Sequence, residues 1–230
     1  IGYYGYTWAP APLSAGLEAA AAQTVLLLSG SNTLAEALAR RLPAGSRLVF
    51  APLAGSQPQE TRDDAGFEHV DAFDPFDADS AARLFASLNA RDLHPRQIVY
   101  CDDSAGEDAL ADAPACPDAL HRGIQAVRRV FVASERTMPG AATRLLYVFR
   151  DAGSSLPHHE AVSGYARSML SVNHRFELAT LCDDREGTDD RAQAIADELG
   201  VNAAFGGNEI ARRGGLRWWG KLPFARLFGR

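Results

Sequence analysis

Lysine is almost absent from this sequence: a single lysine, Lys221, stands among 23 basic residues, and the others are arginine. Any mechanism that needs a lysine amine must therefore use this one residue. Cysteine is also scarce, because the three thiols of Cys101, Cys116 and Cys182 share no close metal-binding spacing. Their odd number does not suit a disulfide framework, and we expect a reducing, cytoplasmic environment.

Long apolar runs and dense clusters of one charge are missing as well. No stretch reaches the roughly 18 apolar residues that span a bilayer, so the sequence predicts no membrane partner. The net charge of -6 and the scattered basic residues argue against nucleic acid as the main partner. The sequence begins at Ile1 without an initiator methionine or an apolar leader, which we interpret as a segment of a larger protein.

What the sequence does contain is a regular alternation of apolar, strand-length runs with amphipathic helical segments. The run at 24–30 predicts a buried strand, and a helix follows at 33–42 with Asn32 or Thr33 as the expected N-cap. Further strands are predicted at 47–54, 67–75, 96–102, 143–153 and 175–183, and further helices at 77–93, 118–137, 158–173 and 188–199. This order predicts an α/β fold with a truncated Rossmann-like, doubly wound, mostly parallel sheet flanked by helices.

We expect residues 1–230 to form one domain with three parts. Residues 1–23 would supply a leading strand and a linker, in which 14–23 is a linker or a short helical piece. Residues 24–200 would form the α/β core, and residues 201–230 the closing strands and an exit linker.

The joint between the first buried strand and its helix is where a dinucleotide-binding fold carries its glycines. Short-chain dehydrogenases have T-G-x-x-x-G-x-G at this turn. Aligning Ser29 and Gly30 with the leading T-G puts Thr33 and Glu36 at the next two glycine positions. The Glu36 carboxylate would cancel the attraction between a diphosphate and the helix N-terminus. We therefore predict that this joint binds no cofactor.

The catalytic pair of short-chain reductases is a tyrosine with a lysine one helical turn later, which lowers the tyrosine pKa by its charge. Tyr165 is the only tyrosine in a suitable helix, and the residue four positions later is Met169. A thioether cannot supply the charge. Lys221 does not complete such a pair either, because Arg217 stands four positions before it.

Two neighbouring histidines, His158 and His159, could bind a metal ion together with Asp151 or Glu160. No i, i+4 histidine pair and no third ligand is visible in the sequence. Histidines that precede a helix are usually exposed. We expect these two to cap the helix and face solvent.

Cys101 lies beside Asp102 and Asp103 at the carboxyl end of a strand, where active sites of open sheets gather. Two adjacent carboxylates would disfavour the thiolate, which is the nucleophilic form. Ser168 lies within a helix and lacks the G-x-S-x-G turn of serine hydrolases. The tryptophans are expected to pack in the core or on edge strands, and they are Trp8, Trp218 and Trp219. The sequence therefore predicts no catalytic, cofactor-binding or metal-binding residues.

Three segments together resemble a known family. "YYGYTWAPAPL" at 3–13, "HHEAVSGYARSMLSVNHRF" at 158–176 and "NEIARRGGLRWWGKL" at 208–222 occur in the order seen in the structural subdomain of modular polyketide synthase ketoreductases. They resemble that family's W-x-P-x-P-L strand, its A-x-x-G-F-A-R-S-L-x-x-E-N-P-R-F helix and its closing E-V-x-Y-R-x-G-x-R-Y-V-x-x-L. The resemblance covers roughly residues 3–222.

The resemblance implies a truncated Rossmann-like half that carries no cofactor and no catalytic residues and that braces a second, catalytic half. The sequence departs from the family pattern at Tyr165 for Phe, Val172 for Glu and His174 for Pro. These departures indicate a trans-acyltransferase assembly line or a pseudo-ketoreductase. The implied partners are adjacent domains of the same synthase: a catalytic ketoreductase half, a methyltransferase, a dehydratase or a carrier protein.

The expected function is thus a non-catalytic scaffold domain of a polyketide synthase module. One alternative is the structural half of an active NADPH-dependent ketoreductase whose catalytic half lies downstream. A second alternative is a small-molecule binding module that uses the carboxyl edge of the sheet.

Overall fold

The computed structural model describes residues 3–4, 7–10, 22–56, 66–102, 116–150, 157–184, 187–200, 209–213, 216–221 and 224–225. Most of the expected linker at 14–23 lies outside these residues. The strands are β1 Tyr3–Tyr4, β2 Thr7–Pro10, β3 Thr24–Ser29, β4 Arg47–Pro52, β5 Glu68–His69, β6 Gln97–Asp102, β7 Thr143–Arg150, β8 Phe176–Asp183, β9 Glu209–Arg213, β10 Leu216–Lys221 and β11 Phe224–Ala225. The helices are α1 Asn32–Ala39, α2 Ser80–Ala90, α3 Cys116–Leu120, the π-helical turn η2 His121–Gln125, α4 Ala126–Thr137, α5 Pro157–Val172 and α6 Thr188–Leu199.

Nine of these strands form one sheet in the order β2-β10-β9-β8-β7-β6-β3-β4-β5. Neighbouring strands from β9 to β5 are parallel, and β10 and β2 add to this sheet in antiparallel orientation. The short strands β1 and β11 pair separately. The predicted fold class, a mostly parallel and doubly wound sheet, is confirmed.

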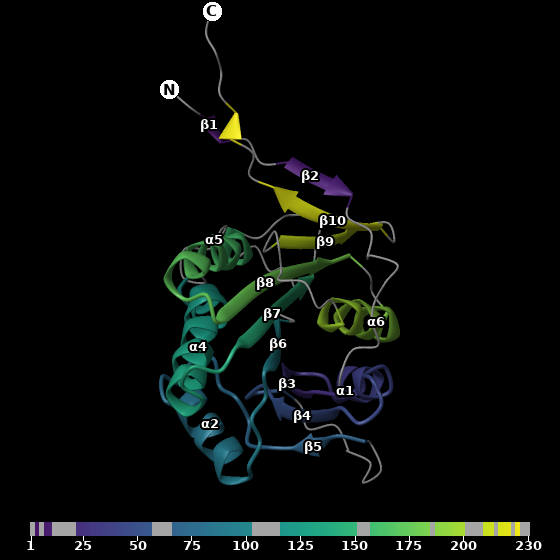
Figure 1. The fold of residues 1–230 in the computed structure, drawn as a ribbon, viewed down its shortest axis with the longest axis vertical. Coiled ribbons are helices and arrows are strands. Elements are labelled where there is room, and N and C mark those ends of the chain that lie inside the picture. Colours follow the sequence, from purple (N-terminus) through teal and green to yellow (C-terminus); the bar gives the residue numbers. More distant parts are fainter. Residues whose placement is uncertain are drawn as a thin grey trace, which may run out of the picture.

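Helices cover both faces of the sheet, with α1 and α6 on one face and α2, α4 and α5 on the other (Figure 1). Side chains alternate between the faces along each strand, as the two-residue period of a strand requires. In β3, for example, Val25 and Leu27 pack toward α1 and α6, whereas Leu26 and Leu28 belong to the cluster under α2, α4 and α5. Both faces are therefore buried, which explains why the strand sequences are continuously apolar.

The two chain ends of the described structure build one edge of the sheet. β2 pairs with β10, so that Trp8 lies opposite Gly220 and Pro10 lies opposite Trp218. The side chain of Trp218 is half-buried against the core. Trp8 thus belongs to the edge strand β2 and Trp218 to its neighbour β10, which agrees with the expectation that the tryptophans lie in the core or on edge strands. No helix among the described residues is long and apolar enough to cross a membrane.

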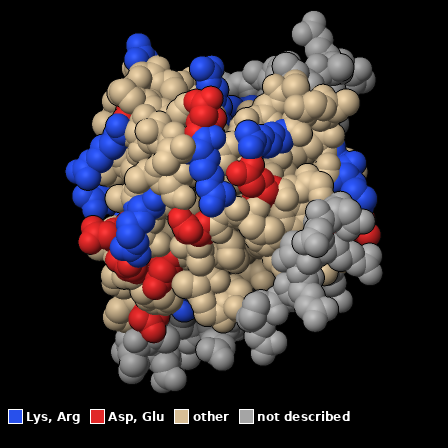
Figure 2. Space-filling view, turned by 90° about the horizontal axis from the view of Figure 1, so that it is seen from below, with Lys and Arg blue, Asp and Glu red and all other residues tan. Residues whose placement is uncertain are grey.

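The opposite edge ends in β5, which is much shorter than the strand predicted at 67–75. Only Glu68 and His69 pair with β4, and Phe73 makes a single bridge to Leu53. The Glu68 carboxylate forms ion pairs with Arg47 at 2.5 Å and Arg91 at 3.5 Å. Seen from this side, positive and negative side chains are interspersed over the surface (Figure 2).

Two local predictions need correction. The N-cap of α1 is Ser31, whose hydroxyl accepts a hydrogen bond from the Leu34 amide at 3.2 Å, and not Asn32 or Thr33. The long helix predicted at 118–137 is interrupted by the π turn η2, where Gly123 has non-helical dihedral angles. By contrast, α6 covers the predicted range 188–199.

Candidate functional site

The carboxyl ends of β3 and β6 mark the point where the strand order reverses, because β3 pairs with β4 on one side and with β6 on the other. Open α/β sheets bind ligands in the crevice outside such a switch point. Two features lie at this edge of the sheet. They are the joint between β3 and α1, and a polar cluster at the end of β6 and the start of α5.

The joint keeps the shape of a phosphate-binding turn, but its polar groups bond to one another. The Ser31 hydroxyl caps the Leu34 amide and lies 2.9 Å from the Thr33 hydroxyl, while the Ser31 amide donates to the Ser29 hydroxyl at 3.2 Å. An added Cβ at Gly30 would come within 2.9 Å of the Ser56 hydroxyl. Gly30 thus lies close to the Ser56 side chain in the turn after β4.

The tyrosine and methionine of α5 both lie against the core. Tyr165 is half-buried, and this burial raises the pKa of its hydroxyl. Met169 is buried in the same cluster, with 6% of its surface exposed. The position four residues after Tyr165 therefore lies in apolar surroundings, where burial of a lysine ammonium would destabilise the fold.

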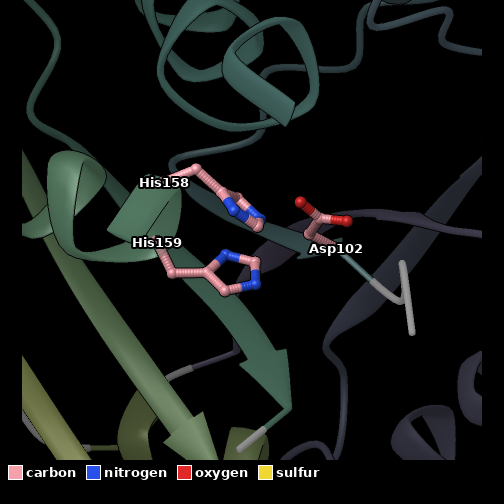
Figure 3. Close-up of side chains that lie close together, drawn as sticks. All are labelled: Asp102, His158 and His159. Carbon is pink, nitrogen blue, oxygen red and sulfur yellow. The ribbon is translucent and has the colours of Figure 1, made fainter. Parts of the chain in front are cut away.

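The polar cluster consists of Asp102, Tyr147, His158 and His159. Asp102 is the last residue of β6, Tyr147 lies in β7, and both histidines belong to the first turn of α5. All four are buried, the exposed fractions being 3%, 0%, 9% and 1%. Figure 3 shows the two imidazoles and the carboxylate converging from their separate elements.

Tyr147 is the centre of this cluster. Its hydroxyl donates to Oδ2 of Asp102 at 2.9 Å, and Nδ1 of His159 lies 2.8 Å from the tyrosine hydroxyl oxygen. A phenol has only one proton, so His159 must donate its Nδ1 proton to Tyr147, which leaves Nε2 of that ring as an acceptor. The His159 ring also stacks on Phe149, with the ring centroids 4.3 Å apart.

Burial shifts the pKa values of the cluster. Loss of solvent, followed by the neighbouring His158, lowers the pKa of His159 to about 4. Loss of solvent also lowers the pKa of His158. Burial and the Asp102 carboxylate hold the pKa of Tyr147 well above its usual value. Both imidazoles and the phenol are therefore neutral at neutral pH.

The π turn packs directly on the cluster. A Cβ at Gly123 would lie 3.6 Å from the backbone oxygen of His158 and 3.8 Å from the Tyr147 hydroxyl. The backbone oxygen of Arg122 accepts a hydrogen bond from Tyr100 at 2.6 Å.

The prediction that His158 and His159 face solvent is wrong. His159 can be buried because the Tyr147 hydroxyl, which also bonds to Asp102, supplies a polar partner for its ring. His158 is buried beside it, with the two ring centroids 3.9 Å apart. Glu160 is exposed, and Asp151 lies outside the described residues. The third group beside the histidines is Asp102, the residue that follows Cys101 in β6.

Cys101 lies beside Asp102 at the carboxyl end of β6, as predicted. Cys101 points to the other face of the sheet and packs in the apolar cluster under α1 and α6. Asp103 lies outside the described residues. Ser168 lies within α5, as predicted, and donates to the Gly164 carbonyl at 3.2 Å. Tyr147 was missed, although a tyrosine in the apolar run "LLYVF", next to a strand that ends in aspartate, was a usable signal.

Comparison with known proteins decides the family. Residues 23–197, more than half of the chain, match the family described as beta-ketoacyl synthase-like, N-terminal. The chain belongs to this beta-ketoacyl synthase-like N-terminal family. None of the curated proteins compared matches the sequence.

Solved structures with a fold similar to that of this family member include a ketoreductase, a multidomain structure that contains a ketoreductase, and a short-chain dehydrogenase. An N-terminal ketoreductase from the macrolactin assembly line has a TM-score of 0.74 and 13% identity, over 97% of this chain and 45% of that one. A structure with adenylation, ketoreductase and pseudo Asub domains from a keto acid-selecting NRPS module has a TM-score of 0.71 and 15% identity. The match covers 97% of this chain and 18% of that one. A short-chain dehydrogenase from Leptospira borgpetersenii with bound NAD+ has a TM-score of 0.64 and 11% identity. The match covers 89% of this chain and 96% of that one.

This chain spans less than half the length of the first two structures. At these identities the similarity concerns the fold. Together with the family match, it confirms the resemblance to assembly-line ketoreductases that the three sequence segments indicated.

Proposed function

We propose that this chain is a non-catalytic structural domain of a polyketide synthase module and that it braces neighbouring catalytic domains. One observation carries the proposal. The chain has the fold of nicotinamide-dependent reductases but lacks the residues that such enzymes use. At the turn that would hold the cofactor, Thr33 and Glu36 stand at two of the glycine positions. Four residues after the helix tyrosine, Met169 stands where the catalytic lysine would be.

The turn argues against a bound diphosphate on electrostatic grounds. A helix N-terminus attracts phosphate because its first amides and the helix dipole are positive. Here the Leu34 amide already donates a hydrogen bond to the Ser31 hydroxyl. The half-buried Glu36 adds a negative charge at the fifth residue of α1. An anion at this site would meet a competing side chain and a like charge.

The strand pairing supports a bracing role. Tyr3 lies opposite Ala225 in the β1–β11 pair, and β2 lies beside β10, so the two ends of the described chain run next to each other. The similar ketoreductase from the macrolactin assembly line is more than twice as long as the part matched here. Both observations fit a rigid unit mounted within a longer polypeptide.

Calorimetric titration with NADPH tests the proposal. We expect no saturable heat with the purified chain, whereas an active short-chain reductase titrated in parallel should bind. Saturable binding with a micromolar dissociation constant would overturn the non-catalytic reading. The Glu36→Gly variant serves as a matched probe, since weak binding that appears only in this variant would support the electrostatic argument.

A second candidate is the structural half of an active NADPH-dependent ketoreductase, which the 45% coverage of the similar ketoreductase favours. In that case the downstream polypeptide supplies the cofactor turn and the catalytic tyrosine. Ketoreduction assayed on the intact polypeptide distinguishes the two: activity supports the second candidate, and its absence with an intact fold supports a pseudo-domain. Binding of NADPH to the isolated chain would contradict both.

A further inference from the structure

The polar cluster places three metal-ligating side chains around one point. Asp102, His158 and His159 each offer one ligand atom, and these atoms all lie within 4.8 Å of one another. The carboxylate comes from the end of β6 and the imidazoles from the first turn of α5, so two separately anchored elements meet there (Figure 3).

One atom of this cluster points independently to a ligand. Nε2 of His158 is buried, and it has no hydrogen-bond partner among the described residues. A buried polar atom without a hydrogen-bond partner destabilises the folded state. Native proteins pair such atoms with protein, water or an ion. An ion placed between the three side chains would accept the lone pair of this nitrogen.

Tyr147 supplies the outer hydrogen bonds that metal ligands usually have. Ligating histidines commonly bond their second ring nitrogen to a further group, which fixes the tautomer and the ring orientation. The Tyr147 hydroxyl contacts both Nδ1 of His159 and Oδ2 of Asp102. A carboxylate has two oxygens, so Asp102 can accept from Tyr147 and still bind a metal.

We propose that Asp102, His158 and His159 form a binding site for a divalent transition metal ion, Zn²⁺ above all. Two imidazoles and one carboxylate suit borderline ions and not Mg²⁺ or Ca²⁺, which take oxygen ligands. In a tetrahedral zinc site with bonds of about 2.0 Å, ligand atoms lie about 3.3 Å apart. The present separations of up to 4.8 Å therefore require the three side chains to close around the ion by small rotations.

Three protein ligands leave a fourth position for water. The ion would fasten the start of α5 to the end of β6 and so stiffen the carboxyl edge of the sheet. This site does not depend on the proposed scaffold function.

Titration of the full chain with ZnCl₂ after EDTA treatment tests the site, with isothermal calorimetry and ¹⁵N-histidine NMR as readouts. We expect one equivalent of Zn²⁺ to bind and to move the signals of two of the six histidines. Asp102→Asn and His158→Gln should lose this binding. Tyr147→Phe should weaken it about 10- to 100-fold.

The matched control is His94→Gln, which alters an exposed histidine that also lies beside an aspartate, with His94 Nε2 3.1 Å from Asp92. This variant should bind as the wild type does. Absence of Zn²⁺ binding by the wild-type chain would overturn the proposal, and so would binding that survives both ligand substitutions or is lost in His94→Gln. The wild-type NMR result decides the matter even where a ligand variant fails to fold.

Discussion

The Tyr147→Phe substitution removes one buried oxygen and leaves two buried polar groups without their shared partner. The hydroxyl donates to Asp102 at 2.9 Å and lies 2.8 Å from Nδ1 of His159, and all three side chains are at most 3% exposed. Each buried group that loses its partner costs about 1–3 kcal/mol, so we expect the free energy of unfolding to fall by about 3 kcal/mol. This is a large share of the ~5–15 kcal/mol that stabilises a typical domain.

Urea denaturation followed by tryptophan fluorescence, with EDTA present to exclude metal, measures this loss. For a chain of this length about 3 kcal/mol corresponds to a fall in melting temperature of about 6–12 °C. Tyr165→Phe is the matched control, because it deletes the same atom from a half-buried ring, and we expect a change within about 0.5 kcal/mol. Equal losses in the two variants would refute the argument that the Tyr147 hydroxyl satisfies a buried network.

Two further predictions concern charge in the interior. Because the pKa of His159 falls to about 4 on folding from 6.5, the folded state binds fewer protons, and the stability present above pH 6.5 should decline as the pH is lowered toward 4. Urea midpoints of the metal-free protein against pH measure this, His94→Gln should keep the wild-type slope, and a flat profile would contradict neutral burial. Met169→Lys should cost about 3 kcal/mol or more by burying an ammonium, whereas Met169→Leu should cost less than about 1.5 kcal/mol. Thermal unfolding compares the melting temperatures of the two Met169 variants. Equal melting temperatures would show that a lysine at position 169 reaches solvent.

Apolar periodicity was enough to predict the sheet and most helices. The runs in β3, β4, β6, β7 and β8 are continuous because both faces of the sheet are covered, and the α6 pattern has a clear apolar stripe ended by Gly200. The strand predicted at 67–75 is longer than β5 because only Glu68 and His69 pair regularly with β4, whereas Phe73 makes a single bridge to Leu53. Pairing across a sheet is not visible in the segment itself.

The candidate site was misread for a related reason. The exposure of His158 and His159 was inferred from residue type, but their burial depends on Tyr147 and on Asp102, which stands more than 50 residues earlier in the chain. Local sequence cannot show such a partner. Strand order could have done so, because β6 and β7 are adjacent parallel strands and their carboxyl ends meet at one edge.

The two edges of the sheet differ in how they can meet a neighbour. At β5 the strand is two residues long, and the Glu68 carboxylate sits between the guanidinium groups of Arg47 and Arg91. An incoming strand would have to disrupt these ion pairs and would find only a short strand to pair with, so this edge disfavours sheet extension. The β5 edge is therefore protected against pairing with a further strand, by its short length and by these ion pairs.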